Sequence, residues 1–254
     1  MIKEKDGVFR ISTENTSYWF RVTKHGPLET IHYGRRLSDD ESIDALLIKR
    51  TGELGSSVLY ESEDRTYCLD YMCLEWSGVG RGDFRMSPAE IKMPDGTFTS
   101  DFIYKSHKIT KGFVKPETLP SAYGEKEDCE TLEIVLEDES NKTQLTLYYT
   151  AYFKTDVITR RAVLRNGADA PLSIRRLMSM SIDIPNKAYR LVTFDGSWIR
   201  EANRHDRALQ YGIYVNSSTT GASSNRHNPG FLIAEERASE TDGEVYGFNL
   251  VYSG

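Results

Sequence analysis

Cysteine is scarce in this sequence, which has only three among its 254 residues: Cys68, Cys73 and Cys129. Three thiols cannot all pair with one another, and their spacing matches no metal-binding motif. A secreted scaffold held together by disulfides is therefore disfavoured, and a reducing compartment such as the cytoplasm is the expected location. We also expect no bound metal and no cofactor.

Long hydrophobic runs are missing as well. The first six residues are mostly charged and no apolar stretch follows them, so no signal peptide is predicted. No segment approaches the roughly 20 apolar residues that a helix needs to span a bilayer. The sequence therefore predicts no insertion into a membrane.

Positive charge is not in excess. Lys and Arg number 32 against 38 Asp and Glu, which gives a formal net charge of -6. A protein that binds nucleic acid normally carries a basic stripe that neutralises phosphates. Nucleic acid is thus not an expected partner.

Several catalytic signatures are also absent. The Gly-rich stretch at residues 78–82 matches neither nucleotide-binding fingerprint, so we interpret it as a bend in a loop. The five histidines are scattered without metal-ligand spacing, and no strained serine elbow occurs. A glycosidase pair of carboxylates leaves no spacing signature, because the two groups need only lie about 5–10 Å apart in space. Most acidic residues alternate with apolar ones, which indicates solvent-facing positions on strands.

The dominant pattern is an alternation of apolar and polar residues. It is clearest at residues 144–153, 172–184, 132–136 and 18–22. Successive side chains of a strand point to opposite faces, so these segments predict half-buried strands. Helical periodicity is confined to residues 39–50, where a short surface helix is expected. Many antiparallel strands without intervening helices predict an all-β fold of two large stacked sheets.

Turn residues separate the alternating segments. Asn166-Gly167 precedes the strand expected from Leu172, which predicts a hairpin or a short loop there. The last nine residues, from Tyr246 onward, read as a strand that stops abruptly. This pattern suggests a chain that ends at a domain boundary, and we expect residues 1–254 to form a single domain.

The least regular region covers residues 52–87 and combines charges, aromatics and glycines. Loops of this kind on a rigid scaffold often carry function. Carboxylates and guanidinium groups form charge-assisted hydrogen bonds that suit sugar hydroxyls, and a Trp ring offers an apolar surface to a pyranose. The residues that supply such groups are Asp64, Arg65, Asp70, Trp76, Asp83 and Arg85. The alternative interpretation is an ion-pair network that fixes the loop.

Short motifs that follow one another over nearly the whole chain resemble one enzyme family. They begin with Asp64-Arg65-Thr66-Tyr67 and Gly82-Asp83-Phe84-Arg85, and continue with Tyr104-Lys105-Ser106-His107, Leu119-Pro120-Ser121-Ala122-Tyr123, Val157-Ile158-Thr159-Arg160 and Met178-Ser179-Met180-Ser181. The most specific motifs lie at residues 221–229 and 243–254. Together they resemble the N-terminal domain of glycoside hydrolase family 36.

The resemblance implies a fold and a function. Members of the family are chiefly bacterial α-galactosidases that hydrolyse melibiose, raffinose and related α-galactosides with retention of configuration. Their two catalytic aspartates lie in a (β/α)8 barrel, which is expected to follow residue 254 and to be absent from this chain. Their N-terminal domain is similar to the antiparallel β-supersandwich of galactose mutarotases, with few short helices. The chain alone is therefore expected to be non-catalytic.

The resemblance also implies partners and site residues. The domain helps the assembly of a homo-oligomer, a tetramer in some members, and its loops reach toward the active-site mouth of a neighbouring subunit. We therefore expect five residues to contact substrate or a neighbouring subunit at that mouth: Asp64, Arg65, Trp76, Asp83 and Arg85. Residues 44–63 depart from the Pro-rich sequence expected there, which leaves the preference among galactosides open.

Two other functions remain open. A free-standing carbohydrate-binding module would need exposed aromatic side chains in a groove, for which Trp76 and Trp198 are candidates. An aldose mutarotase would share the supersandwich fold, but its chemistry requires a His–Glu acid/base arrangement. None of the five histidines lies in a motif of that kind.

Overall fold

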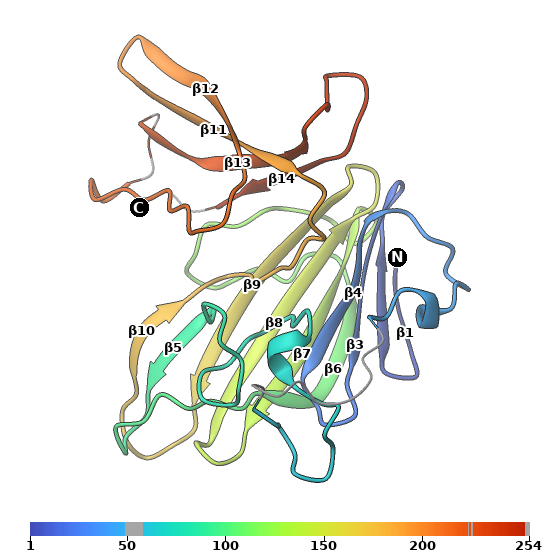
Figure 1. Ribbon diagram of the computed structural model, residues 1–254, viewed down its shortest axis with the longest axis vertical. Coiled ribbons are helices and arrows are strands. Elements are labelled where there is room, and N and C mark those ends of the chain that lie inside the picture. The colour runs from blue at the N-terminus through green and yellow to red at the C-terminus, as the bar shows by residue number, and fades with distance from the viewer. Residues whose placement is uncertain (49–57, 223, 225, 252–254) are drawn as a thin grey trace. The chain divides into compact units, whose positions relative to one another are not determined.

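The computed structural model describes residues 1–48, 58–222, 224 and 226–251 (Figure 1). The described residues form strands, connecting loops and two single-turn 3-10 helices. The elements are, in order, β1 (Ile2–Lys5), β2 (Val8–Ser12), β3 (Thr16–Val22), β4 (Leu28–Arg35), η1 (Ile43–Ala45), η2 (Leu69–Tyr71), β5 (Ala89–Lys92), β6 (Ile103–Lys111), β7 (Cys129–Asp138), β8 (Thr143–Tyr152), β9 (Val157–Asn166), β10 (Ser173–Leu177), β11 (Tyr189–Ser197), β12 (Arg200–Ala208), β13 (His227–Glu235) and β14 (Val245–Asn249).

The chain divides into two compact units. Unit 1 consists of Met1–Val114 and Tyr123–Ile184, and unit 2 consists of Lys115–Ala122 and Pro185–Gly254. Among the described residues, unit 1 contains three antiparallel sheets and unit 2 contains one.

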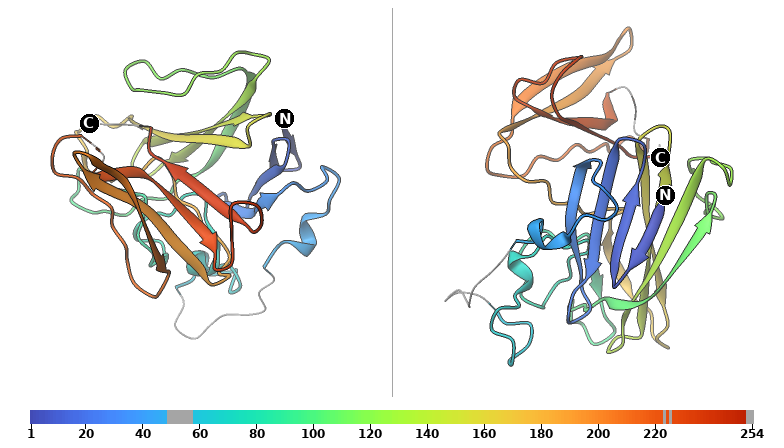
Figure 2. Two further views of the ribbon diagram at one scale, coloured as in Figure 1. Left: turned by 90° about the horizontal axis from the view of Figure 1, so that it is seen from above. Right: turned by 90° about the vertical axis from the view of Figure 1, so that its right-hand side faces the viewer.

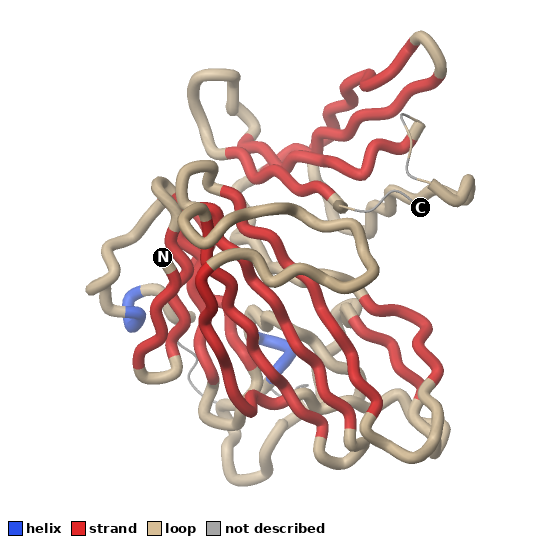
Figure 3. Tube along the Cα trace, turned by 180° about the vertical axis from the view of Figure 1, so that it is seen from behind, coloured by secondary structure: helices blue, strands red, loops and turns tan. Residues whose placement is uncertain are grey.

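Unit 1 contains two four-stranded antiparallel sheets that share one core. One sheet has the strand order β1-β2-β3-β4 and the other has the order β6-β7-β8-β9, while β5 and β10 form a separate two-stranded ladder (Figure 1). Figures 2 and 3 show the long strands of this unit from three further directions. Buried side chains from both four-stranded sheets belong to a single hydrophobic cluster. The two sheets therefore stack face to face, as the alternation of apolar residues predicts.

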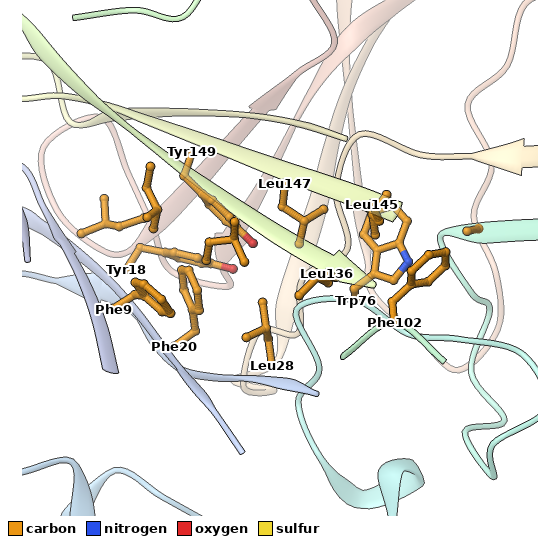
Figure 4. Close-up of a cluster of buried hydrophobic side chains, with 14 of the residues drawn as sticks. Phe9, Tyr18, Phe20, Leu28, Trp76, Phe102, Leu136, Leu145, Leu147 and Tyr149 are labelled. Carbon is orange, nitrogen blue, oxygen red and sulfur yellow. The ribbon is translucent and has the colours of Figure 1, made fainter. Parts of the chain in front are cut away.

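Alternation along β8 shows how the sequence produces this core. Leu145, Leu147 and Tyr149 are 0%, 2% and 0% exposed, whereas the residues between them lie on the partly exposed face. Aromatic rings bridge the sheets: Phe20 on β3 stacks on Tyr149 with ring centroids 5.0 Å apart (Figure 4). Full burial of one such side chain stabilises the fold by about 1.5–3 kcal/mol.

Unit 2 contains one four-stranded antiparallel sheet with the order β12-β11-β13-β14. Val192 on the central strand β11 is buried, and the rings of Phe231 and Phe248 stack across β13 and β14 with centroids 4.9 Å apart. Cross-strand pairs of this kind are the main source of stability within a sheet.

The all-β antiparallel architecture expected from the sequence is confirmed, but one strand is much shorter than predicted. The alternation predicts a strand over residues 172–184, whereas β10 covers only Ser173–Leu177. In the following segment, residues 178–184, the pairing with β5 ends after one more backbone bond. The N–H of Met178 donates to the carbonyl of Pro88, and the carbonyl of Ser181 accepts from Arg160. Beyond Met178, the bond from Arg160 takes the place of further strand pairing.

Two further expectations are refined by the structure. β10 pairs with β5 and not with β9, so Asn166-Gly167 begins a loop and is not a hairpin turn between neighbouring strands. The helix expected over residues 39–50 is reduced to the single turn η1, and Lys49 and Arg50 lie outside the described residues.

Candidate functional site

The irregular region that the sequence analysis selected is described from residue 58 to residue 88, and we call this segment the site loop. Its only regular element is η2. The middle of the loop lies along β4, where the N–H of Glu75 donates to the carbonyl of Leu28 at 3.0 Å and the N–H of Thr30 donates to the carbonyl of Cys73 at 2.6 Å. The edge strand of the β1–β4 sheet therefore anchors the centre of the site loop.

The first half of the site loop is fixed by Asp64. Its carboxylate accepts from Nζ of Lys24 at 2.8 Å and lies 3.1 Å from Nε2 of His25, both in the turn between β3 and β4. The hydroxyl of Thr66 also donates to it, at 2.9 Å. The hydrogen bond from Lys24, followed by those from His25 and Thr66, holds the pKa of Asp64 well below its usual range. Arg65, the next residue of the site loop after Asp64, is exposed in a turn of that loop.

Aromatic side chains support the same half of the loop. The His25 ring meets Tyr67 edge-on with centroids 4.6 Å apart, and Tyr67 lies against Tyr60 at 5.4 Å. Burial raises the pKa of Tyr67 to about 12, so its hydroxyl keeps its proton at neutral pH. The hydroxyl of Tyr60 donates to both carboxylate oxygens of Asp101, at 2.9 and 3.0 Å.

The second half of the loop is organised around Arg85. Its Nε donates to Oδ1 of Asp83 at 2.8 Å, and its Nη1 donates to Oδ2 of Asp183 at 2.7 Å. Its Nη2 donates to the carbonyls of Leu69, at 3.0 Å, and of Met72. One guanidinium thus closes this half of the loop into a fixed shape and ties it to the segment after β10.

The two carboxylates that flank Arg85 differ in environment. The side chain of Asp83 is 0% exposed, and its Oδ2 has no hydrogen-bond partner among the described residues. The side chain of Asp183 is 44% exposed. Partial burial raises the pKa of Asp183, and the nearby Arg85 charge opposes that shift. Arg85 is therefore the main compensation for the buried charge of Asp83.

The two tryptophans considered for sugar binding lie in opposite environments. Trp76 is 6% exposed and belongs to the hydrophobic cluster of unit 1 (Figure 4). Its ring packs against core side chains and supports the site loop from inside. Trp198, in the turn between β11 and β12 of unit 2, is 86% exposed.

The structure shows which of the five selected residues share a cluster. Asp83 and Arg85 form one ion pair, Asp64 belongs to the Lys24–His25 cluster, and Trp76 lies in the core. The partners of these residues could not be predicted from the sequence, because Lys24, His25 and Asp183 are remote in sequence from the groups they bind.

Chemically, the site loop offers charged hydrogen-bonding groups. Within the part of the chain that the structure describes, no three His, Cys, Asp or Glu side chains are grouped so that they could hold a metal ion. A search of the same residues finds no helix long and apolar enough to cross a membrane.

Comparison with known proteins places this arrangement in context. The model of the glycosyl hydrolase family 36 N-terminal domain matches residues 26–254. Alpha-galactosidase AgaA of Geobacillus stearothermophilus is 35% identical over 247 residues, which are 97% of this chain and 34% of that protein. The bifunctional alpha-galactosidase/sucrose kinase AgaSK of Mediterraneibacter gnavus is 30% identical over 97% of this chain and 26% of its own length. The chain thus spans between about a quarter and a third of the length of the curated relatives it matches.

Solved structures give the same picture. The crystal structure of the GH36 alpha-galactosidase AgaB from Geobacillus stearothermophilus superposes with a TM-score of 0.92 at 34% identity, over 100% of this chain and 35% of that one. A variant of AgaA from the same organism, solved in complex with raffinose, superposes with a TM-score of 0.92 at 35% identity, over 97% of this chain and 34% of that one.

Proposed function

Because this chain belongs to the family of glycosyl hydrolase family 36 N-terminal domains, we propose that it is the non-catalytic N-terminal domain of an α-galactosidase. The observation that carries this proposal is the coverage: α-galactosidase AgaA matches 97% of this chain, but the match spans only 34% of that enzyme. The part of the enzyme beyond residue 254 would then supply the catalytic (β/α)8 barrel and its two aspartates. Units 1 and 2 together would form the one N-terminal domain.

The role of the domain in this proposal is to shape the active-site mouth and to support a homo-oligomer, in the form of a tetramer. Three site-loop residues would face the mouth, namely Asp64, Arg65 and Arg85, and Asp83, whose side chain is fully buried, would hold Arg85 in place there. The support is that Arg65 is exposed while Asp64 beside it is held by Lys24 and His25. A charged group on a fixed turn suits recognition of a sugar hydroxyl or of a neighbouring subunit. Trp76 would act indirectly, by supporting the loop from the core.

The substrates in this proposal are α-galactosides such as raffinose and melibiose. The relative solved with raffinose, which is 35% identical, supports this class. We place the enzyme in the cytoplasm, because Cys68 and Cys129 are buried free thiols that suit a reducing compartment. We assign it to a bacterium, as is the case for its relatives AgaA and AgaSK.

Assaying two proteins side by side tests the proposal. The 254-residue chain should release no nitrophenol from a nitrophenyl α-galactoside, whereas the full-length protein should turn this substrate over. Turnover by the 254-residue chain that disappears on replacement of one of its own acidic residues would refute the non-catalytic role.

A carbohydrate-binding module is the second candidate, favoured by the exposed ring of Trp198. Titration of the 254-residue chain with galactose and melibiose distinguishes the two functions. A module would bind with a dissociation constant better than about 1 mM, and Trp198→Ala would abolish that binding. The non-catalytic domain of an α-galactosidase would show no such affinity on its own.

A further inference from the structure

A buried carboxylate from the site loop lies between the stacked sheets of unit 1. Glu75 is 0% exposed. Its Oε1 accepts from the hydroxyls of Tyr18 on β3 and Thr30 on β4, both at 2.5 Å. Its Oε2 accepts from the hydroxyl of Tyr149 on β8 at 2.8 Å and from Nη2 of Arg160 on β9 at 3.0 Å. Each carboxylate oxygen of Glu75 therefore accepts two hydrogen bonds, and the donors come from both sheets.

Arg160 is the cation that balances this charge. Its side chain is 7% exposed, and its guanidinium lies 4.8 Å from the ring centroid of Tyr149. Its Nη1 donates to the hydroxyl of Tyr18 at 2.9 Å and to the carbonyl of Ser181 at 2.9 Å. Figure 4 shows the rings of Tyr18 and Tyr149, from facing sheets, lying side by side in the core. Arg160 thus connects the core to the segment at residues 178–184.

The segment at residues 178–184 is also bound by the site loop, close to its C-terminal end. Two residues beyond Ser181, the carboxylate of Asp183 accepts from Arg85 at 2.7 Å. A closed circuit results, in which Glu75 binds Arg160, Arg160 binds the carbonyl at 181, and Asp183 binds Arg85. Both loop members of the circuit, Glu75 and Arg85, bracket Trp76 and Asp83. The circuit therefore fixes the second half of the site loop at both of its ends.

If the ion pair between Glu75 and Arg160 served only to stabilise the fold, it would not need to be charged. A buried ion pair is on average no more stabilising than well-packed apolar residues of the same volume. The ion pair also fixes an orientation, because a planar guanidinium donates its hydrogen bonds in fixed directions. Arg160 donates one of these hydrogen bonds to the carbonyl of Ser181 and so sets the position at which Asp183 meets Arg85.

We propose that Glu75 and Arg160 are positioning residues of the candidate site, which place Asp83 and Arg85 through the segment at residues 178–184. They act through other residues and do not contact substrate. The consequence for galactoside binding rests on the proposed function, whereas the effect on the loop does not.

Hydrogen exchange of the 254-residue chain tests the positioning itself. Arg160→Lys keeps the charge beside Glu75 but cannot reach Ser181 with the same geometry. The amides of Phe84 and Arg85, which donate to Asp70 and Asp83, should exchange about tenfold faster, as expected for the loss of one hydrogen bond that restrains the loop.

Thr131→Val is the matched control. Thr131 is also buried and bonds Thr150 at 2.9 Å, but it lies outside the circuit. T131V should lower the melting temperature and leave exchange in the site loop unchanged. Glu75→Gln should act like Arg160→Lys if it folds. Unchanged exchange at Phe84 and Arg85 in R160K would overturn the proposal.

Kinetics of the full-length protein test the consequence. With a nitrophenyl α-galactoside, R160K should raise KM roughly three- to tenfold while kcat changes little, which indicates weaker binding without loss of the chemical step. T131V should change neither constant. A wild-type protein without turnover would refute the proposed function and leave the exchange result standing. Altered exchange with an unchanged KM would overturn the link between this circuit and substrate binding.

Discussion

The guanidinium of Arg85 donates to the carboxylate of Asp183 at 2.7 Å, although 98 positions of sequence separate the two residues. The same guanidinium also binds Asp83 and the carbonyls of Leu69 and Met72. A single side chain therefore connects three parts of unit 1 that have almost no regular structure. This connection explains how the site loop keeps a defined shape without strands or long helices.

Replacing Arg85 should destabilise unit 1. In Arg85→Ala the buried carboxylate of Asp83 loses its cation, and removing one partner of a buried ion pair costs about 3–5 kcal/mol. Arg85→Lys should cost less, about 1–3 kcal/mol, because Lys keeps the charge but loses several of the hydrogen bonds. Urea unfolding of the 254-residue chain measures both free energies.

The double variant D83N/R85A serves as the control for the buried charge. It removes both charges at once, so it should be more stable than R85A alone. A double variant that is no more stable than R85A would show that the cost does not arise from the unpaired Asp83.

Trp76 and Trp198 provide a second prediction, because one is buried and the other is exposed. Trp76→Ala should lower the free energy of unfolding by about 3–5 kcal/mol, as expected for a large residue removed from a core. Trp198→Ala should change it by less than about 0.5 kcal/mol. Denaturation of the two variants in parallel makes the comparison. Equal effects would contradict the assignment of Trp76 to the core.

The strands could be predicted from the sequence because a period of two depends only on neighbouring residues. In β8 every second side chain is buried, and the alternation at residues 144–153 shows this directly. The same pattern failed at residues 178–184, where Arg160 and Arg85 bind the segment from the side. Nothing local in the sequence records these bonds.

The contacts within the site loop were beyond prediction for the same reason. A lone acid between Leu74 and Trp76 does not reveal that Glu75 meets Arg160, which is 85 positions away. Likewise, the sequence shows a tryptophan at position 76 but not the direction of its ring. Composition indicated which loop concentrates charged and aromatic groups, whereas the role of each side chain depends on partners that only the folded chain brings together.

The ion pairs of Asp64 lead to a prediction about pH. Hydrogen bonds from Lys24, His25 and Thr66 lower the pKa of Asp64, so the folded state favours its carboxylate form. The resulting stability is present above the ordinary Asp pKa of about 4 and is lost as the pH falls toward the lowered value. The difference in free energy of unfolding between the wild type and Asp64→Asn should therefore shrink between about pH 5 and pH 2.

Denaturant titrations at several pH values measure this difference. Asp6, which is exposed in the turn between β1 and β2, supplies the control variant Asp6→Asn. Its difference from the wild type should not shrink in this way. A difference for Asp64→Asn that stays constant or grows on acidification would contradict the stabilising role of the Lys24–His25 cluster.

The last prediction concerns Arg65, which is exposed beside the fixed carboxylate of Asp64. If it faces the active-site mouth, Arg65→Ala in the full-length protein should raise KM roughly three- to tenfold, as expected for the loss of one hydrogen bond, or weaken the oligomer. The stability of the fold should change by less than about 0.5 kcal/mol, because the residue lies on the surface. Steady-state kinetics measure the KM, and analytical ultracentrifugation measures the assembly.

Arg165, exposed on β9, is the matched control, and Arg165→Ala should leave KM and assembly unchanged. Should Arg65→Ala behave in the same way as this control, Arg65 takes no part in the mouth.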